Sequence, residues 1–215
     1  MKGISAKGKH SYNDFFLSIA ERKISPPSLK RITETVPYMN GEYDFSYLDG
    51  EIALENRELY YSFEIAEIST EQMEETKQNF LSWLYSIVDS DIFDDYLPNY
   101  YFHGSLKNVE WTEDFGKGIL NATFSVYPYK FEKKETTINL SVNQKIETTI
   151  NVNSTHPIIP SIFTSDEINL KVNDNNFSLS NGKYSYEELK LSPGENKIII
   201  EGTSEVVFTY RNEMI

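Results

Sequence analysis

A single stretch of the chain, residues 69–88, has a helical pattern among segments that otherwise indicate strands and turns. Ser69 and Gln72 have the spacing of a capping box, and the acidic residues that follow suit the positive end of a helix dipole. Apolar residues recur on one face of the expected helix: Met73, Phe80, Leu84, Ile87 and Val88, flanked by Leu81 and Trp83. We therefore expect this helix to cover a β-sheet, with Lys77 and Gln78 facing away from it.

Strand patterns precede and follow the helix. They cover residues 15–24, 30–36, 43–48, 58–68, 99–111 and 118–129. Residues 11–14 indicate a turn, and the acidic residues 86–96 indicate an irregular loop. The aromatic residues of the two later strands are explained by cross-strand pairing within a sheet. The first part of the chain is thus expected to be a β-sheet domain with one packed α-helix.

The composition changes near residue 134, where aromatic residues become fewer and Thr, Asn, Ile and Val predominate. Short strand patterns separated by turn signals follow at residues 136–142, 146–152, 168–172, 177–179, 197–201 and 205–210. Several short strands at nearly regular spacing are typical of a β-sandwich. A chain of 215 residues is long enough for two small domains. We expect a mainly β (α+β) protein with domains at residues 1–133 and 134–215.

The charge of the chain, −13 overall, is unevenly distributed. Residues 1–41 contain seven basic and three acidic residues, whereas residues 42–114 contain three basic and eighteen acidic residues. This balance argues against binding of nucleic acid, which requires clustered Lys and Arg. Three explanations remain open for the acidic segment. The first is that the segment is a solvated face, and the second is that it meets a basic surface on a neighbouring copy. The third is that it lines a passage to which DNA must not bind.

Signs of catalysis are weak. The chain has no cysteine, no nucleophile elbow, no phosphate-binding loop and no zinc-protease motif. The aspartates of the acidic loop lack the glycine and final glutamate of a calcium-binding loop, so a solvated loop is expected at Asp89, Asp91, Asp94 and Asp95. The histidines lie far apart in the sequence, at His10, His103 and His156. We expect no enzyme activity, cofactor or metal; a hydrolase with an unrecognised carboxylate pair is the third-ranked alternative.

Two tyrosines of the expected sandwich, Tyr184 and Tyr186, suggest a different class of function. Exposed aromatic rings can stack on sugars, so a carbohydrate-binding or adhesin protein is the alternative interpretation. Both tyrosines are equally suited to a strand. We find no signal-peptide pattern in the sequence, which argues against this alternative.

Several segments resemble the distal tail protein family of long-tailed phages and prophages of Gram-positive bacteria. The first of these segments is residues 1–15 (MKGISAKGKHSYNDF). The others are residues 32–38 (ITETVPY), 41–46 (GEYDFS), 57–63 (RELYYSF), 191–200 (LSPGENKIII) and 207–211 (VFTYR). The resemblance extends over the whole chain, although no single motif is diagnostic.

This resemblance implies a structural protein of the virion at the phage tail tip, made in the cytoplasm of the bacterial host. The N-terminal domain would form a ring, typically of six copies, that continues the tail tube, and a galectin-like or carbohydrate-module-like sandwich would follow. The ring would join the tail tube protein to the tail-associated spike or lysin protein, and in some phages to receptor-binding proteins. DNA would pass through it, and an acidic lumen would let DNA slide without binding.

Overall fold

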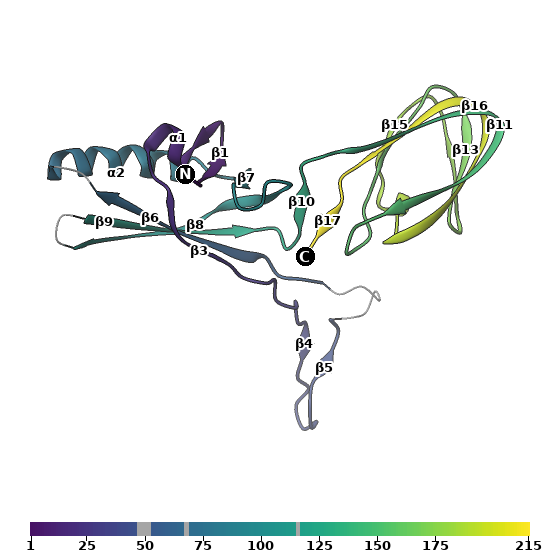
Figure 1. The fold of residues 1–215 in the computed structure, drawn as a ribbon. Helices are drawn as coiled ribbons and strands as arrows, with labels where there is room; N and C mark the ends of the chain where they lie inside the picture. The colour runs from purple at the N-terminus through teal and green to yellow at the C-terminus, as the bar shows by residue number, and fades with distance from the viewer. Residues whose placement is uncertain (47–52, 67–68, 115–116) are drawn as a thin grey trace. The chain divides into compact units, whose positions relative to one another are not determined.

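The computed structural model describes residues 1–46, 53–66, 69–114 and 117–215. The chain divides into two compact units, residues 1–130 with Ile215, and residues 131–214 (Figure 1). It is mainly β, and the predicted fold class is confirmed. No helix among these residues is long and apolar enough to cross a membrane.

The first unit contains an antiparallel sheet with the strand order β2-β1-β7-β8-β9-β6-β3. These strands are β1 (Ile4–Ala6), β2 (Lys9–His10), β3 (Ile19–Ile24), β6 (Arg57–Ala66), β7 (Ser90–Asp94), β8 (Tyr100–Asp114) and β9 (Lys117–Val126). Alternate residues of β6 and β9 are buried, among them Tyr61 and Phe63, which pair with Ala122 and Leu120. This period of two places one apolar face of the sheet against the core.

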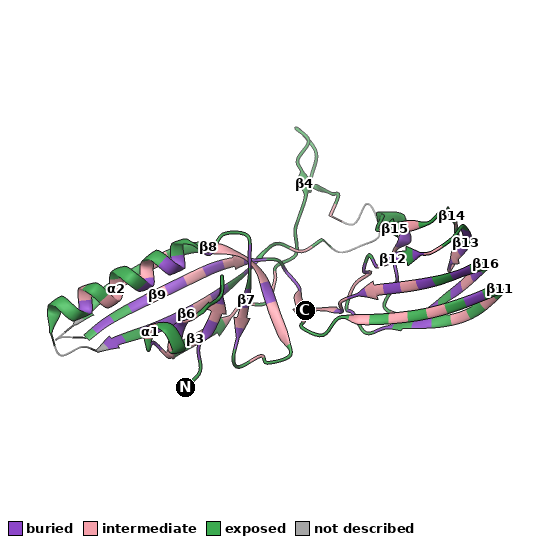
Figure 2. Cartoon of the chain, turned by 90° about the horizontal axis from the view of Figure 1, so that it is seen from above, coloured by how far each residue is buried: buried purple, intermediate pink, exposed green. Residues whose placement is uncertain are grey.

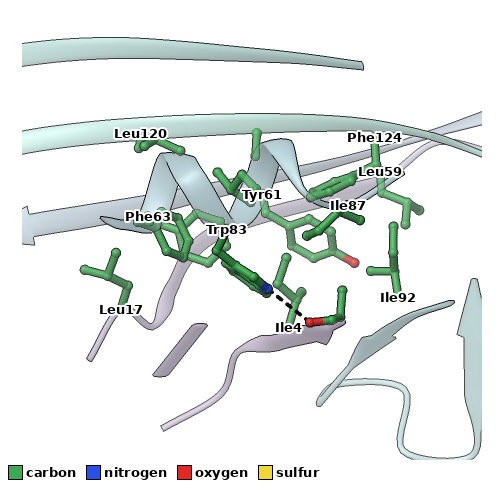
Figure 3. Packing of buried hydrophobic residues seen from close by; sticks show 14 of the residues in the cluster. Ile4, Leu17, Leu59, Tyr61, Phe63, Trp83, Ile87, Ile92, Leu120 and Phe124 are labelled. Carbon is green, nitrogen blue, oxygen red and sulfur yellow. Dashed lines mark hydrogen bonds between the residues drawn. The ribbon is translucent and has the colours of Figure 1, made fainter. Parts of the chain in front are cut away.

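Helix α2 (Thr70–Tyr85) covers this apolar face, and the cap predicted at Ser69 is present, since its Oγ accepts from Gln72 N at 3.2 Å. Phe80 packs edge-to-face on Phe63 with ring centroids 4.9 Å apart. Trp83 lies in the same core and donates from Nε1 to Ala6 O at 3.0 Å (Figure 3). The predicted apolar face is therefore the packed face.

The helix ends earlier than predicted. Ser86 N donates to Trp83 O and Ile87 N donates to Leu84 O. These hydrogen bonds join residues three apart, as in a 3₁₀ helix, and the α-helix ends at Tyr85. Ile87 is buried, but Val88 is 61% exposed. The prediction that Lys77 faces away from the sheet is also wrong in part: its Nζ lies 4.7 Å from the ring centroid of Trp111, a residue of β8. A long lysine stem can cover an aromatic ring while its ammonium stays near water.

Two further local predictions are wrong. Residues 11–14 belong to a short helix, α1 (Ser11–Phe15), because His10 Nδ1 accepts from Tyr12 N at 2.9 Å and from Asn13 N at 3.2 Å. The acidic stretch predicted to be irregular contains β7 instead, in which Ser90, Ile92 and Asp94 are buried alternately. The carboxylate of Asp94 is hydrogen-bonded, so burial of this acidic residue is tolerated.

Strands β4 (Thr33–Glu34) and β5 (Tyr43–Asp44) pair only with each other among the described strands. They are much shorter than the strands expected at residues 30–36 and 43–48. Residues 47–48 and 67–68, the ends of two predicted strands, lie outside the described residues.

The second unit is a β-sandwich. Its elements are β11 (Thr136–Val152), β12 (Ser161–Thr164), β13 (Ile168–Val172), β14 (Asn175–Leu179), β15 (Gly182–Tyr184), the 3₁₀ helix η1 (Glu187–Leu189) and β16 (Gly194–Tyr210). Strands β10 (Lys130–Glu132) and β17 (Glu213–Met214) pair with each other and lie outside its six-stranded sheet. Strands β13 and β14 extend one half of β16, and β12 and β15 extend the other. Figure 2 shows mainly intermediate and exposed residues alternating along β11, and buried residues alternating with less buried ones along much of β16.

Four predicted strands of this unit are in fact two. Strands β11 and β16 pair without interruption from Thr136 opposite Tyr210 to Val152 opposite Gly194. At the middle of this pair, Gln144 and Gly202 both have positive φ, of 72° and 137°. Turn-like residues within a strand therefore mark a bend in a continuous ladder and not its end.

Candidate functional site

Residues 28–46 and 53–55 form a two-stranded arm in which no residue is buried. Hydrogen bonds between main-chain groups join its two sides, from Lys30 N to Ala53 O at 2.9 Å and from Phe45 N to Ile32 O at 2.8 Å. Two strands without further support are marginally stable in water. The arm therefore lacks a folding partner among the described residues.

The surface of the arm is unusually apolar. Seven large hydrophobic side chains are exposed on it: Leu29, Ile32, Val36, Tyr38, Met39, Tyr43 and Phe45. The rings of Tyr43 and Phe45 stack with centroids 6.1 Å apart. Single exposed apolar residues are ordinary, but a group of them on one element marks an interaction surface. The arm is thus suited to contact another chain.

The far part of the arm is also acidic. Residues 32–46 contain Glu34, Glu42 and Asp44 and no basic residue. A hydrogen bond from Ser46 lowers the pKa of Asp44, so this carboxylate stays charged at neutral pH. A partner surface would have to combine apolar contacts with positive charge.

A hollow that combines aromatic rings with lysines lies beside helices α1 and α2. It measures about 410 Å³ and is lined by Lys7, Lys9, Asp14, Phe15, Asn79, Ser82, Trp83 and Ser86, which we call the helix hollow. Phe15 and Trp83 stack in it with centroids 5.2 Å apart, and Lys9 Nζ lies 5.5 Å from the ring centroid of Phe15. Phe16, the next residue, is 80% exposed. The helix hollow offers aromatic surface and two lysines.

The aspartates predicted to form a solvated loop separate into two structural groups. Asp89 and Asp91 contact the two ring nitrogens of His103, with Nε2 to Asp89 Oδ1 at 3.0 Å and Nδ1 to Asp91 Oδ1 at 2.8 Å. Asp95 accepts from Gly3 N at 2.9 Å and contacts His10 Nε2 at 3.0 Å. Throughout the described residues, no group of three or more acidic, histidine or cysteine side chains is arranged to hold a metal ion.

Asp94 is the residue of this stretch that sequence reasoning missed. Its buried carboxylate accepts from Arg22 Nε at 2.6 Å and from the Tyr61 hydroxyl at 2.9 Å, and so ties β7 to β3 and β6. Burial, together with the charge of Asp94, raises the pKa of Tyr61 well above its usual value. No local sequence signal distinguishes Asp94 from its exposed neighbours, because its partners lie 33 and 72 residues away.

The other histidines are structural contacts. His10 caps α1, as described above, and His156 Nε2 lies 3.1 Å from Glu213 Oε2. His103 lies between its two aspartates, and the hydrogen bond to Asp91 raises the pKa of its imidazole. The structure therefore gives each histidine an acidic partner.

Tyr184 and Tyr186 lie side by side at the end of β15, with ring centroids 5.6 Å apart and ring planes inclined by 57°. The Tyr184 hydroxyl donates to Ser180 O at 2.9 Å, and its ring packs partly against the sandwich core. Tyr186 is 43% exposed. The sugar-binding role considered for these residues stays a prediction.

Comparisons with known proteins identify the fold. No family model matches the sequence, and no curated protein resembles it in sequence. Among solved structures, the Dit protein (gp 19.1) of phage SPP1 superposes with a TM-score of 0.72 at 15% identity, over 98% of this chain and 99% of that protein. Its structure is presented as a paradigm of the hub adsorption apparatus in phages that infect Gram-positive bacteria.

Two chains of the activated phage p2 baseplate, with strontium and with calcium, match with TM-scores of only 0.42 and 0.38, at 9% and 10% identity. They cover 98% and 97% of this chain, and 98% of each baseplate chain. The resemblance seen in the sequence is confirmed at the level of the fold. Over nearly its whole length, this chain has the fold of a phage distal tail protein.

Proposed function

We propose that this protein is a structural hub of a phage tail tip, in which copies of the chain assemble into a closed ring. The observation that carries the proposal is the exposed apolar arm, which needs a surface on another molecule to bury its side chains. The fold shared with SPP1 Dit, a hub protein of an adsorption apparatus, supports the same role.

In this proposal the arm of one copy packs into the helix hollow of the next. Tyr38, Met39 and the stacked rings of Tyr43 and Phe45 would contact the aromatic surface of Phe15. The three carboxylates of residues 32–46 would face Lys7 and Lys9. Arm and hollow are different surfaces, so the contact is head-to-tail and produces a ring when the rotation closes. Six copies are the number that the family resemblance implies.

The ring would connect the tail tube protein to the tail-associated spike or lysin protein, and in some phages to receptor-binding proteins. DNA would cross its lumen, which the acidic residues of segment 42–114 would line or border. A negative wall repels DNA and prevents it from adhering. The protein would accordingly belong to the virion, at the tail tip, and carry no catalytic activity.

Charge reversal tests the contact between arm and helix hollow. Replacing both lysines, Lys7→Glu with Lys9→Glu, should weaken assembly by about tenfold or more, because like charges would meet at the interface. Glu34→Lys with Glu42→Lys should have the same effect, and the chain with all four substitutions should assemble again. Light scattering of the protein alone and with its tail partners is the measurement. The matched control, Lys183→Glu with Lys197→Glu on the sandwich, should leave assembly unchanged.

If the fourfold variant assembles no better than either double variant, the arm does not bind the helix hollow. If all variants assemble as the wild type does, neither charge set lies at an interface between copies.

A second candidate function, saccharide binding by the sandwich, is favoured by a different feature. A hollow of about 420 Å³ opens on the face formed by β11, β13, β14 and β16. Amide, hydroxyl and charged groups line it, among them Asn169, Ser178 and Glu201, and Ser178 Oγ donates to Asn169 Oδ1 at 2.8 Å. Titration with purified bacterial cell-wall polysaccharide tests it. Loss of binding in Asn169→Ala supports this hollow as the site, and loss in Tyr186→Ala supports the tyrosine pair.

A further inference from the structure

Arg57, the first residue of β6, is a buried cation that has no hydrogen-bonded counter-charge in the part of the chain that the structure describes. Only 5% of the residue is exposed, and its Nε and Nη2 atoms have no hydrogen-bond partner among the described residues. The ring of Phe102 lies 5.8 Å from the guanidinium carbon and provides only a weak, nonspecific contact. Arginine cannot relieve this burial by losing its proton near neutral pH. Among the described residues, therefore, no group of opposite charge is hydrogen-bonded to these two nitrogen atoms.

The two unpaired donors of Arg57 define the missing group. Nε and Nη2 form one edge of the planar guanidinium. Their N–H bonds are nearly parallel and form a fork with two donors. This edge matches two oxygen atoms of a carboxylate, phosphate or sulfate. A water molecule or a single carbonyl oxygen offers only one acceptor atom to the two donors and carries no counter-charge.

A second cation lies close by. Burial lowers the pKa of Lys130, and the positive charge of Arg57 lowers it further. Its Nζ lies 5.4 Å from the ring centroid of Tyr100 and donates to the main-chain oxygen of Ile215. Arg57 lies over Phe102 and Lys130 over Tyr100, and these two rings are two residues apart on β8, so both cations lie on the same face of this strand. Burial is the only influence resolved on Arg57 itself. An anion between them would compensate both.

We propose that Arg57 and Lys130 form a binding site for an oxyanion. The anion accepts two hydrogen bonds from Nε and Nη2 of Arg57 and a third from Nζ of Lys130. It enters past Lys130, which is only half-buried, and displaces the ammonium from Ile215. Its source is either a free anion of the solution or an acidic side chain of a second copy. The site is independent of the contact between arm and helix hollow.

Thermal unfolding of the full chain in phosphate, sulfate and chloride at equal ionic strength tests the site. Phosphate or sulfate should raise the Tm by about 2–4 °C above chloride once the site is filled. Arg57→Met removes the buried charge, so its Tm in chloride should equal or exceed that of the wild type, and the response to phosphate should vanish. Arg57→Lys keeps a cation without the fork and should bind phosphate about tenfold more weakly or worse. Lys183→Met, an exposed lysine on β15, is the control and should respond as the wild type does.

Light scattering separates the two sources of the anion. If a carboxylate of a second copy fills the site, Arg57→Met lowers association about tenfold or more, and phosphate competes with association of the wild type. If a free anion fills it, association is unaffected and only the Tm responds. Should Arg57→Met fail to fold, Arg57→Lys and Lys130→Met decide the outcome by the same two readouts. A wild type that shows neither a phosphate-specific Tm shift nor association competed by phosphate would overturn the proposal.

Discussion

Individual residues of the first unit are held by contacts that cross long stretches of sequence, and Asp94 is the clearest case. Its side chain has no exposed surface and bonds Arg22 and Tyr61. Asp94→Ala leaves the cation and hydroxyl without their acceptor, so we expect it to lower the free energy of unfolding by about 3–5 kcal/mol. The exposed Asp91→Ala should cost less than about 1 kcal/mol. Urea denaturation of both variants makes the comparison, and equal losses would disprove the special role of Asp94.

The environment of His103 should make the free energy of unfolding depend on pH. Its pKa is raised in the folded state by Asp91 and Asp89, so the folded protein holds this proton more tightly than the unfolded chain. The resulting stabilisation is fully present below about pH 6.5, the usual pKa of histidine, and is lost as pH rises through the raised value. The side chain is 41% exposed, so the effect stays below about 1 kcal/mol. Unfolding of wild type and His103→Gln across pH should converge at alkaline pH, and a gap that widens there would contradict the assignment.

At the scale of elements, α2 and the sheet share one core, and substitutions can test which face of α2 packs against the sheet. Phe80 and Leu84 have no exposed surface, so Phe80→Ala and Leu84→Ala should each cost about 2–5 kcal/mol. Gln78→Ala, on the exposed face, should stay within about 0.5 kcal/mol of the wild type. Lys77→Ala should cost slightly more than Gln78→Ala, because Lys77 covers Trp111. Denaturant melts measure all four, and a loss at Gln78 as large as at Phe80 would refute the packing.

The same elements show what the sequence could predict. Periodicity located α2 and the buried faces of β6 and β9, because an apolar residue at every second or fourth position has a direct structural meaning. It failed at Gln144 and Gly202, where a bend within two paired strands resembles two strand ends. It also failed at β7, where Asp94 is buried against Arg22 and Asp91 pairs with His103. Such long-range compensation has no local signature.

The functional surfaces were harder still to predict. Tyr43 and Phe45 alternate with polar residues as in a half-buried strand, yet both are exposed on the arm. Whether an apolar face is covered depends on tertiary contacts that a strand pattern does not contain. The fork of Arg57 was invisible for the same reason, since a lone arginine at a strand end is usually solvated.

At the scale of the whole molecule, the division into two units predicts separate folding. β10 pairs with β17, and Glu132 N donates to Asn212 O at 2.9 Å, so residues before 134 contribute to the second unit. A fragment of residues 131–214 should therefore melt cooperatively with all-β circular dichroism. A fragment that begins at residue 134 should have a lower Tm, since it lacks the whole of β10. An unfolded 131–214 fragment beside a folded full chain would show that the units are interdependent.

The central claim is that copies of this chain form a ring through the arm and the helix hollow, and a cross-link between two introduced cysteines tests it most directly. The chain has no cysteine of its own, so Met39→Cys on the arm and Ser82→Cys in the helix hollow introduce the only thiols. Oxidation of the assembled tail-tip complex should give a ladder of covalent oligomers that ends at a closed ring, expected at six copies. Each single variant should give dimers at most. A complex that contains this chain as a lone copy, or in which the double variant gives no ladder, would contradict the account.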